Sequence, residues 1–160
     1  RKCEITENMN AKELHDQLAV LGADLLHVEL MDHLRGNLAA IPQDHTKATY
    51  AKKIEKTESE LKWTDSASQL HNKVRAFVMG PGTWTMFAGK KIKIHKTQIS
   101  SVAVSTNKSG QIMSISDQAL VVATGSGALE ILELQPESRT RMTVADFLKG
   151  NSLKEGDLFG

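Results

Sequence analysis

The side chains best suited to binding chemistry are positive charges concentrated in one stretch of the chain. No Asp or Glu occurs between Asp65 and Asp117, and this stretch holds Lys73, Arg75, Lys90, Lys91, Lys93, Lys96 and Lys108. Cations without acidic neighbours raise the local potential and attract polyanions, of which nucleic acid is the commonest. The alternative is that these side chains are an ordinary solvated surface.

The net charge of +1 hides a partition between two parts of the chain. Residues 1–65 carry 9 basic and 12 acidic side chains, whereas residues 66–160 carry 11 basic and 7 acidic ones. The second part is therefore the one whose charge favours an anionic partner.

Alternation of side chains in residues 91–95 predicts a strand with one charged face. Positions two apart on a strand share a face, so Ile92 and Ile94 are expected to point into a core. Lys91, Lys93 and His95 then point outward together. This positive stripe could follow a phosphate backbone, or it could be simply the wet face of a strand.

The sequence lacks the patterns of the common catalytic and metal sites. The glycine pairs at 80–82 and 125–127 match neither a dinucleotide loop, a P-loop nor a nucleophile elbow. The histidines are not spaced as a helical metal pair, and a single cysteine, Cys3, allows no internal disulfide and no cysteine cluster for zinc. We expect no catalytic residue, cofactor site or metal site in these residues.

The composition is that of a globular chain, with 160 residues, 40% of them hydrophobic and 24% charged. This length suits one large domain or two small ones. No stretch approaches the roughly 18 apolar residues of a membrane helix, and the first residues lack the apolar core of a signal peptide. We expect a cytosolic or equivalent compartment and no membrane partner. Because the chain begins at Arg1, we also expect it to be a piece of a longer protein.

A long apolar helix is predicted over residues 11–35. Asn10 and Glu13 form a capping box, and leucines and valines recur every three or four positions from 14 to 34. Gly22 is expected to bend or divide the helix, and Gly36 to end it. A helix with so much apolar surface needs a body to pack against.

The rest of the chain predicts short strands with small helices. Ser66 and Gln69 cap a helix that ends at the turn 80–82, and Thr143 caps a last helix through Leu148. Trp63, Trp84 and Phe77 are expected in the core rather than as base-stacking platforms. Turn signals, including one at 107–110, separate five predicted strands, at 84–88, 91–99, 111–116, 120–124 and 128–134. We predict an α+β, mainly β fold: an open barrel of the oligonucleotide-binding (OB) type with short helices.

Residues 134–148, Leu-Gln-Pro-Glu-Ser-Arg-Thr-Arg-Met-Thr-Val-Ala-Asp-Phe-Leu, carry a resemblance to a known family. They resemble the closing motif of the methionyl-tRNA formyltransferases, in which Leu-Gln-Pro precedes a basic pair, Met and a short helix. Segments at 14–34, 48–54, 75–77 and 121–129 resemble the same family in the same order, so the similarity covers nearly the whole chain. Residues 78–81 depart from the family's Asn-Pro-Trp-Pro turn, and 138–141 from its Gly-Lys-Lys run.

The resemblance implies a division of the chain and a function. Residues 1–40 would be the helical end of a Rossmann-like catalytic domain, 41–64 a linker and 65–160 an OB-like tRNA-binding domain. The full-length enzyme would transfer a formyl group from 10-formyltetrahydrofolate, its cosubstrate, to initiator methionyl-tRNA. No histidine here lies in the family's His-x-Ser-Leu-Leu-Pro context, so its catalytic Asn, His and Asp are not carried over. We expect a monomer in the bacterial cytoplasm or an organelle matrix, with no cofactor on this segment.

The residues expected to contact tRNA phosphates are basic and lie in three groups. Arg75 is a weaker candidate because its stem could serve helix packing. A stand-alone nucleic-acid-binding OB module is an alternative, as is the tail of a sister formyltransferase or a formyl-folate hydrolase. The apolar helix disfavours the first, and the Leu-Gln-Pro motif with its basic pair disfavours the others. The predicted contact residues are Lys52, Lys53 and Lys56 in the linker, Lys91 and Lys93 on the strand, and Arg139, Arg141, Lys149 and Lys154 near the end.

Overall fold

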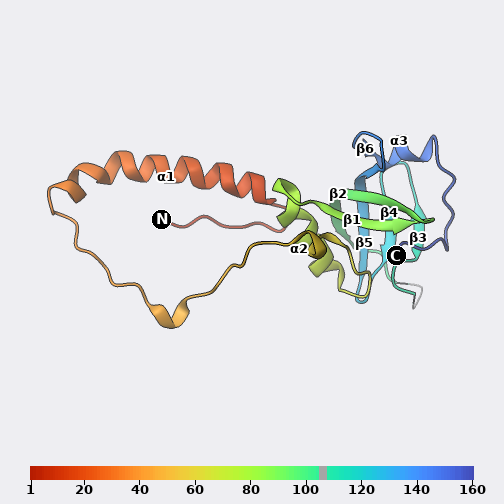
Figure 1. Ribbon diagram of the computed structural model, residues 1–160, viewed down its shortest axis with the longest axis horizontal. Helices are drawn as coiled ribbons and strands as arrows, with labels where there is room; N and C mark the ends of the chain where they lie inside the picture. The colour runs from red at the N-terminus through yellow and green to blue at the C-terminus, as the bar shows by residue number, and fades with distance from the viewer. Residues whose placement is uncertain (105–107) are drawn as a thin grey trace. The chain divides into compact units, whose positions relative to one another are not determined.

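The computed structural model describes residues 1–104 and 108–160 and divides the chain into two compact units. These units are Arg1–Ile54 and Glu55–Gly160 (Figure 1). The predicted turn at 107–110 begins at Asn107, which lies outside the described residues. The division between Ile54 and Glu55 falls inside the linker predicted over 41–64.

The first unit is built around one helix, α1 (Ala11–Leu34). Its capping box is confirmed, because the backbone N–H groups of Lys12 and Glu13 donate to Asn10 Oδ1 at 2.9 and 3.0 Å. Gly22 does not divide the helix, which is continuous over 24 residues. Gly36 ends it with a φ of +75°, as predicted. A short 3₁₀ turn, η1 (His45–Lys47), follows in the same unit.

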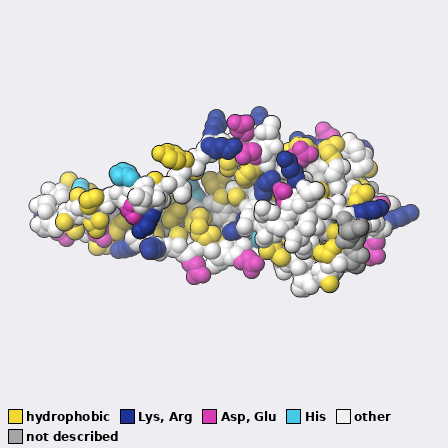
Figure 2. Space-filling view, turned by 90° about the horizontal axis from the view of Figure 1, so that it is seen from below, with side chains coloured by type: hydrophobic (Ala, Val, Ile, Leu, Met, Phe, Trp, Pro, Cys, Tyr) yellow, Lys and Arg dark blue, Asp and Glu magenta, His cyan; other side chains and the backbone are white. Residues whose placement is uncertain are grey.

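The apolar side chains of α1 remain largely exposed. None of its residues, all of which are described, is buried, and Val28 and Leu34 are 60% and 69% exposed. Figure 2 shows hydrophobic side chains gathered over this part of the chain. In the described part of the chain, no helix has both the length and the apolar character needed to cross a bilayer. The need of α1 for an apolar body stays a prediction.

An antiparallel sheet organises the second unit (Figure 1). Its strands run in the order β1-β2-β5-β4-β3, and the short β6 pairs with β5. All five predicted strands are confirmed, and β6 was not predicted from the sequence. The strands are β1 (Thr83–Phe87), β2 (Lys90–Ser100), β3 (Ile112–Ile115), β4 (Leu120–Ala123), β5 (Ala128–Pro136) and β6 (Met142–Thr143).

Short helices cover the sheet and close the core. They are η2 (Lys56–Ser59), α2 (Ala67–Ala76), η3 (Phe77–Met79) and α3 (Val144–Leu148). Ser66 and Gln69 form the predicted capping box of α2, and the hydroxyl of Thr143 caps α3 by accepting from the N–H of Asp146. Leu70 of α2 and Phe147 of α3 are buried among the strand side chains.

Residues 55–64 belong to the second unit although their sequence reads as linker. Leu61 and Trp63 lie in its core, and the N–H of Leu61 donates to the carbonyl of Trp84 at 2.8 Å. The indole Nε1 of Trp63 donates to Thr85 Oγ1 at 2.9 Å. The segment is held by an isolated bridge between Glu60 and Trp84 and by the buried Trp63. It therefore needs neither helical nor strand periodicity, and its sequence pattern resembles that of a linker.

The sheet is open, and its closure into an OB-type barrel is not confirmed. Among the described residues the edge strands β1 and β3 do not pair with each other. The last residues of the chain bridge them instead: Gly160 donates to the carbonyl of Met86 at 3.0 Å, and Ile112 donates to that of Asp157 at 2.8 Å. The fold is therefore α+β with an antiparallel sheet and short helices.

We predict that Gly125→Ala destabilises the second unit, because the added Cβ would lie 1.8 Å from the carbonyl oxygen of Thr64. Backbone atoms must move to relieve this overlap, which costs about 1–3 kcal/mol in overpacked sites. Urea unfolding followed by Trp fluorescence measures the loss. Gly150→Ala is the control, since its Cβ would meet nothing within 4 Å. Equal midpoints for the two variants would contradict the close approach of Gly125 to the segment before α2.

Candidate functional site

The outer face of β2 carries the positive stripe that the sequence predicted. Ile92 and Ile94 are 3% and 2% exposed, whereas Lys91 and Lys93 are exposed on the opposite face. Strand pairing forces this division, because β2 lies between β1 and β5 and its inward side chains meet the core. Neither lysine forms an ion pair with the described residues.

Trp84 lies beside this stripe and not in the core, so the expectation for it was wrong. It pairs with Lys93 across β1 and β2, which places it on the outer face. The Nζ of Lys91 lies 3.9 Å from the centroid of its ring, a cation–π contact. Trp63 does lie in the core, as expected, whereas Phe77 is only half-buried and lies outside the core cluster. Strand alternation explains the error, since Thr83 and Thr85 take the inward positions of β1.

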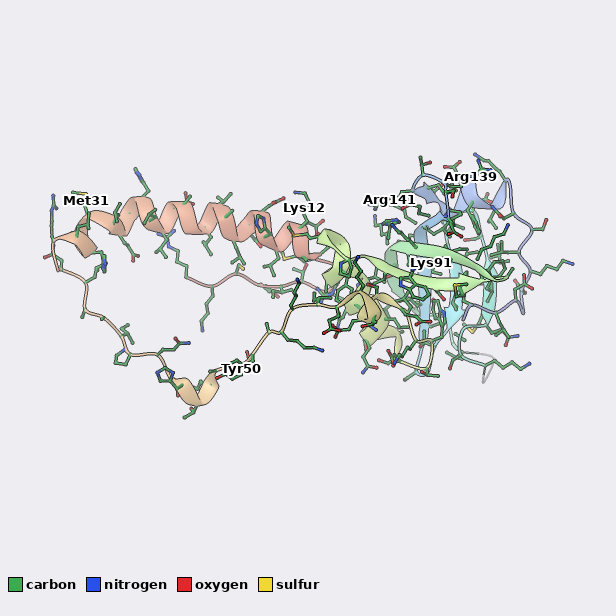
Figure 3. The ribbon with its side chains drawn as sticks, in the orientation of Figure 1. Lys12, Met31, Tyr50, Lys91, Arg139 and Arg141 are labelled. Atoms are coloured by element: carbon green, nitrogen blue, oxygen red, sulfur yellow. The ribbon has the colours of Figure 1, made fainter. Side chains whose placement is uncertain are left out.

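The turn between β5 and β6 brings two further cations to the same face. Gln135 pairs with Lys93 in the β2–β5 register, and its Nε2 donates to the carbonyl of Arg139 at 2.7 Å. Arg141 Nε donates to Glu133 Oε2 at 2.6 Å. Figure 3 shows Lys91, Arg139 and Arg141 on the same part of the second unit, at the turn and the adjoining strands.

Two neighbouring hollows lie in this surface. The smaller has a volume of about 260 Å³, with Lys91 and Lys93 in its wall beside Gln135 and Glu137. The larger has a volume of about 610 Å³, and Lys90, Lys91 and Arg139 lie around it. Lys91 lines both hollows, as do Pro136 and Glu137. The two are therefore parts of one surface.

The structure gathers some of the predicted contact residues and separates others. Lys91, Lys93 and Arg139 meet around the hollows, with Arg141 in the adjacent turn paired to Glu133. Lys90, which was not predicted, joins them; the acid-free stretch was the signal that could have identified it. The others do not line these hollows: Lys52 and Lys53 belong to the first unit, Lys56 lies in η2, Lys149 pairs with Asp146 at 2.7 Å, and Lys154 lies in an exposed turn.

His95 sits at the end of the stripe with a perturbed ring. Burial lowers the pKa of this imidazole, and the positive charges of Arg141 and Lys93 lower it further. A hydrogen bond between its Nε2 and Gln135 Oε1, 3.0 Å long, and the Glu133 carboxylate act in the opposite direction. The net effect favours neutral imidazole, so the stripe takes its charge from the lysines and arginines.

No chemistry beyond binding is visible at this surface. Across residues 1–104 and 108–160, no three His, Cys, Asp or Glu side chains come together as metal ligands. The side chains that the strands and turn assemble are cations, amides, apolar groups and the two carboxylates of Glu137 and Asp146. Such a set can hold an anion and flat apolar groups.

Comparisons with known proteins agree on one family. A family model described as formyl transferase, C-terminal domain, matches residues 53–152. A methionyl-tRNA formyltransferase of Bdellovibrio bacteriovorus is 52% identical over 162 residues, which cover 100% of this chain and 51% of that protein. One of Carboxydothermus hydrogenoformans is 40% identical, with 99% and 51% covered. The chain thus spans about half the length of the curated relatives it matches.

Solved structures share the fold. A variant of HypX from Aquifex aeolicus matches with a TM-score of 0.68 at 18% identity, covering 100% of this chain and 31% of that one. HypX in complex with tetrahydrofolic acid matches with a TM-score of 0.55 at 21% identity, covering 82% and 25%. At such identities the likeness concerns the architecture alone.

We predict that Lys93→Gln raises the pKa of His95, because the substitution removes a positive charge that disfavours imidazolium. NMR titration of the ring protons measures the change, with Lys62→Gln as the charge-matched control. The wild-type pKa should lie below the ordinary value of 6.5, since burial is its main cause. The imidazole of His95 is then protonated more readily in the unfolded chain than in the folded one. His95 therefore lowers the free energy of unfolding as the pH falls below about 6.5 and has no such effect above it. An unchanged pKa in Lys93→Gln would contradict the placement of Lys93.

Proposed function

We infer the function of this chain from its family: it belongs to the formyl transferases and carries their C-terminal domain. We propose that it is the C-terminal part of a methionyl-tRNA formyltransferase. In this role it holds initiator methionyl-tRNA while a formyl group passes from 10-formyltetrahydrofolate to the methionine amine in a catalytic domain. The 52% identity to a protein of that name over the whole chain supports this proposal over a sister formyltransferase or a formyl-folate hydrolase.

One observation carries the proposal: Lys91, Lys93 and Arg139 converge on one surface, and no described carboxylate forms an ion pair with them. Lysine and arginine contacts to phosphates fix the position and orientation of a nucleic acid without reading its sequence. A tRNA body held in this way has its amino-acid end delivered to a distant site, which lowers the entropic cost of the encounter. Contacts from Lys52, Lys53, Lys56, Arg141, Lys149 and Lys154 belong to the same proposal.

The proposal also assigns the parts of the chain. Residues 1–40 form the helical end of a catalytic domain, and the exposed apolar side chains of α1 support this assignment because they need a covering body. The same side chains argue against a stand-alone module. Residues 41–64 connect the parts, with 55–64 packed onto the second unit, and 65–160 form a tRNA-binding domain of the OB type. The bridges that the last residues make to both edge strands support that architecture.

We further propose that the full-length protein is a monomer in the bacterial cytoplasm or an organelle matrix. No cofactor is bound by this segment, and the folate is the cosubstrate of the catalytic domain.

We predict that reversing both stripe charges, Lys91→Glu with Lys93→Glu, weakens binding of initiator tRNA to this chain at least tenfold at moderate salt. Phosphate contacts are lost and repulsion replaces them. Filter binding across a salt series measures the affinity, and the slope of log K against log salt should become shallower by about two phosphate contacts.

Lys2→Glu with Lys62→Glu is the matched control, because it makes the same change in net charge at two lysines that line neither hollow. The control should bind nearly as the wild type does. Equal weakening in both double variants would show that net charge, and not this surface, determines binding.

We also predict that the 160-residue chain by itself forms no formylmethionyl-tRNA from methionyl-tRNA and 10-formyltetrahydrofolate. The family's catalytic Asn, His and Asp have no counterpart here. Acid gel electrophoresis of the tRNA product measures the reaction, with a complete formyltransferase as the positive control. Turnover above the uncatalysed rate would overturn the assignment of catalysis to another domain.

A further inference from the structure

The larger hollow has a floor that phosphate contacts leave unused. Its volume of about 610 Å³ falls within the roughly 300–1,000 Å³ of small-molecule sites. Ile92, Pro136 and Phe147 form part of its lining, together with Phe87 and Met142. An apolar floor of this size on a cationic surface suits a ligand that has a flat apolar part.

Phe87 and Met142 are the apolar side chains that this floor offers to a ligand. Ile92 and Phe147 are only 3% and 2% exposed, whereas Phe87 and Met142 are half-buried and pack against the core. The ring of Phe87 lies 5.1 Å from that of Phe159, centroid to centroid. The core thus holds the ring from one side and leaves it in a fixed position, at low entropic cost for a ligand that stacks on it.

The charges around the hollow place an anion at one end. Lys91 stands on the wall shared with the smaller hollow, where Lys93 lies beside it, and Lys90 and Arg139 lie around the larger one. Two carboxylates are also present, those of Glu137 and Asp146. Asp146 is occupied, because Lys149 donates to it at 2.7 Å and Thr143 at 3.0 Å. Glu137 lines both hollows, but in the smaller one it faces two lysines, so a phosphate is favoured over Lys91 and Lys93.

We propose that the larger hollow takes the base of an unpaired ribonucleotide, stacked against Phe87 and Met142, while its phosphate lies over Lys91 and Lys93 in the smaller hollow. Only an unpaired nucleotide can supply such a base, since bases in a duplex are stacked and their faces are covered. The carboxylate of Glu137 is an acceptor for a base amino group. This inference rests on the proposed RNA-binding function and adds a base site to its phosphate contacts.

The test compares a single-stranded RNA with an abasic RNA of equal length and charge. For the wild-type chain we expect the abasic strand to bind about tenfold more weakly, the size expected for one lost stacking interaction, at equal salt dependence. Phe87→Leu and Met142→Gln should each reduce this difference while leaving the affinity for the abasic strand unchanged. Phe77→Leu, an aromatic substitution outside the hollows, should keep it in full. Thermal unfolding checks that each variant is folded.

Titration with a free nucleoside monophosphate shows whether the base site accepts a free mononucleotide or only a nucleotide within an RNA strand. If it shifts the Met142 methyl resonance at submillimolar concentration, the base site also accepts mononucleotides, which supports the site; a shift only with RNA supports it as a site for the strand. Equal binding of the intact and abasic strands overturns the base site and leaves the phosphate contacts standing. Absence of binding to either strand overturns both the base site and the proposed function.

Discussion

The pairing of β2 with β1 on one side and β5 on the other is the constraint on which the surface depends. It buries Ile92 and Ile94 and, by the two-residue period of a strand, turns Lys91 and Lys93 outward. A slip of one residue would exchange the two sets and put lysines in the core. The free energy that fixes the lysines is therefore the burial of the isoleucines, and the charges themselves need no stabilising partner.

An irregularity in the same strand keeps its later charges outside. The β2–β5 register shifts between Ile94 and Lys96 and again before Thr97. Strict alternation from Ile92 and Ile94 would turn Lys96 inward, but the shift exposes Lys96 and buries Thr97 instead. A buried lysine without a partner would cost several kcal/mol. The bulge thus keeps all four lysines of β2, at positions 90, 91, 93 and 96, out of the core. His95 lies within the bulge and is half-buried.

The sequence predicted the parts of the structure that follow local periodicity and missed those set by tertiary contacts. The caps at Asn10, Ser66 and Thr143 and the strand alternation depend on neighbours within a few residues, and the structure confirms them. Trp84 was expected in the core because its size suggested burial, yet only strand pairing decides its face. Residues 55–64 looked like a linker because their contacts, a bridge from Glu60 to Trp84 and a hydrogen bond from Trp63 to Thr85, reach residues far along the chain. The two hollows required the β5–β6 turn to be placed beside β2, and no local pattern encodes that.

The basic side chains near the hollows differ in their contacts: some form ion pairs with carboxylates of the described residues, and others do not. Arg141 and Lys149 hold carboxylates at 2.6 and 2.7 Å, and because an ion pair at the protein surface contributes little, a phosphate can compete for these cations. Lys91 is ordered differently, because the ring of Trp84 holds its ammonium without neutralising it. This contact restricts the lysine in the free protein, so part of the rotamer entropy that it would lose on binding is already lost. Trp84, which was expected in the core, thus contacts the lysine that lines both hollows, at the position where we propose a phosphate.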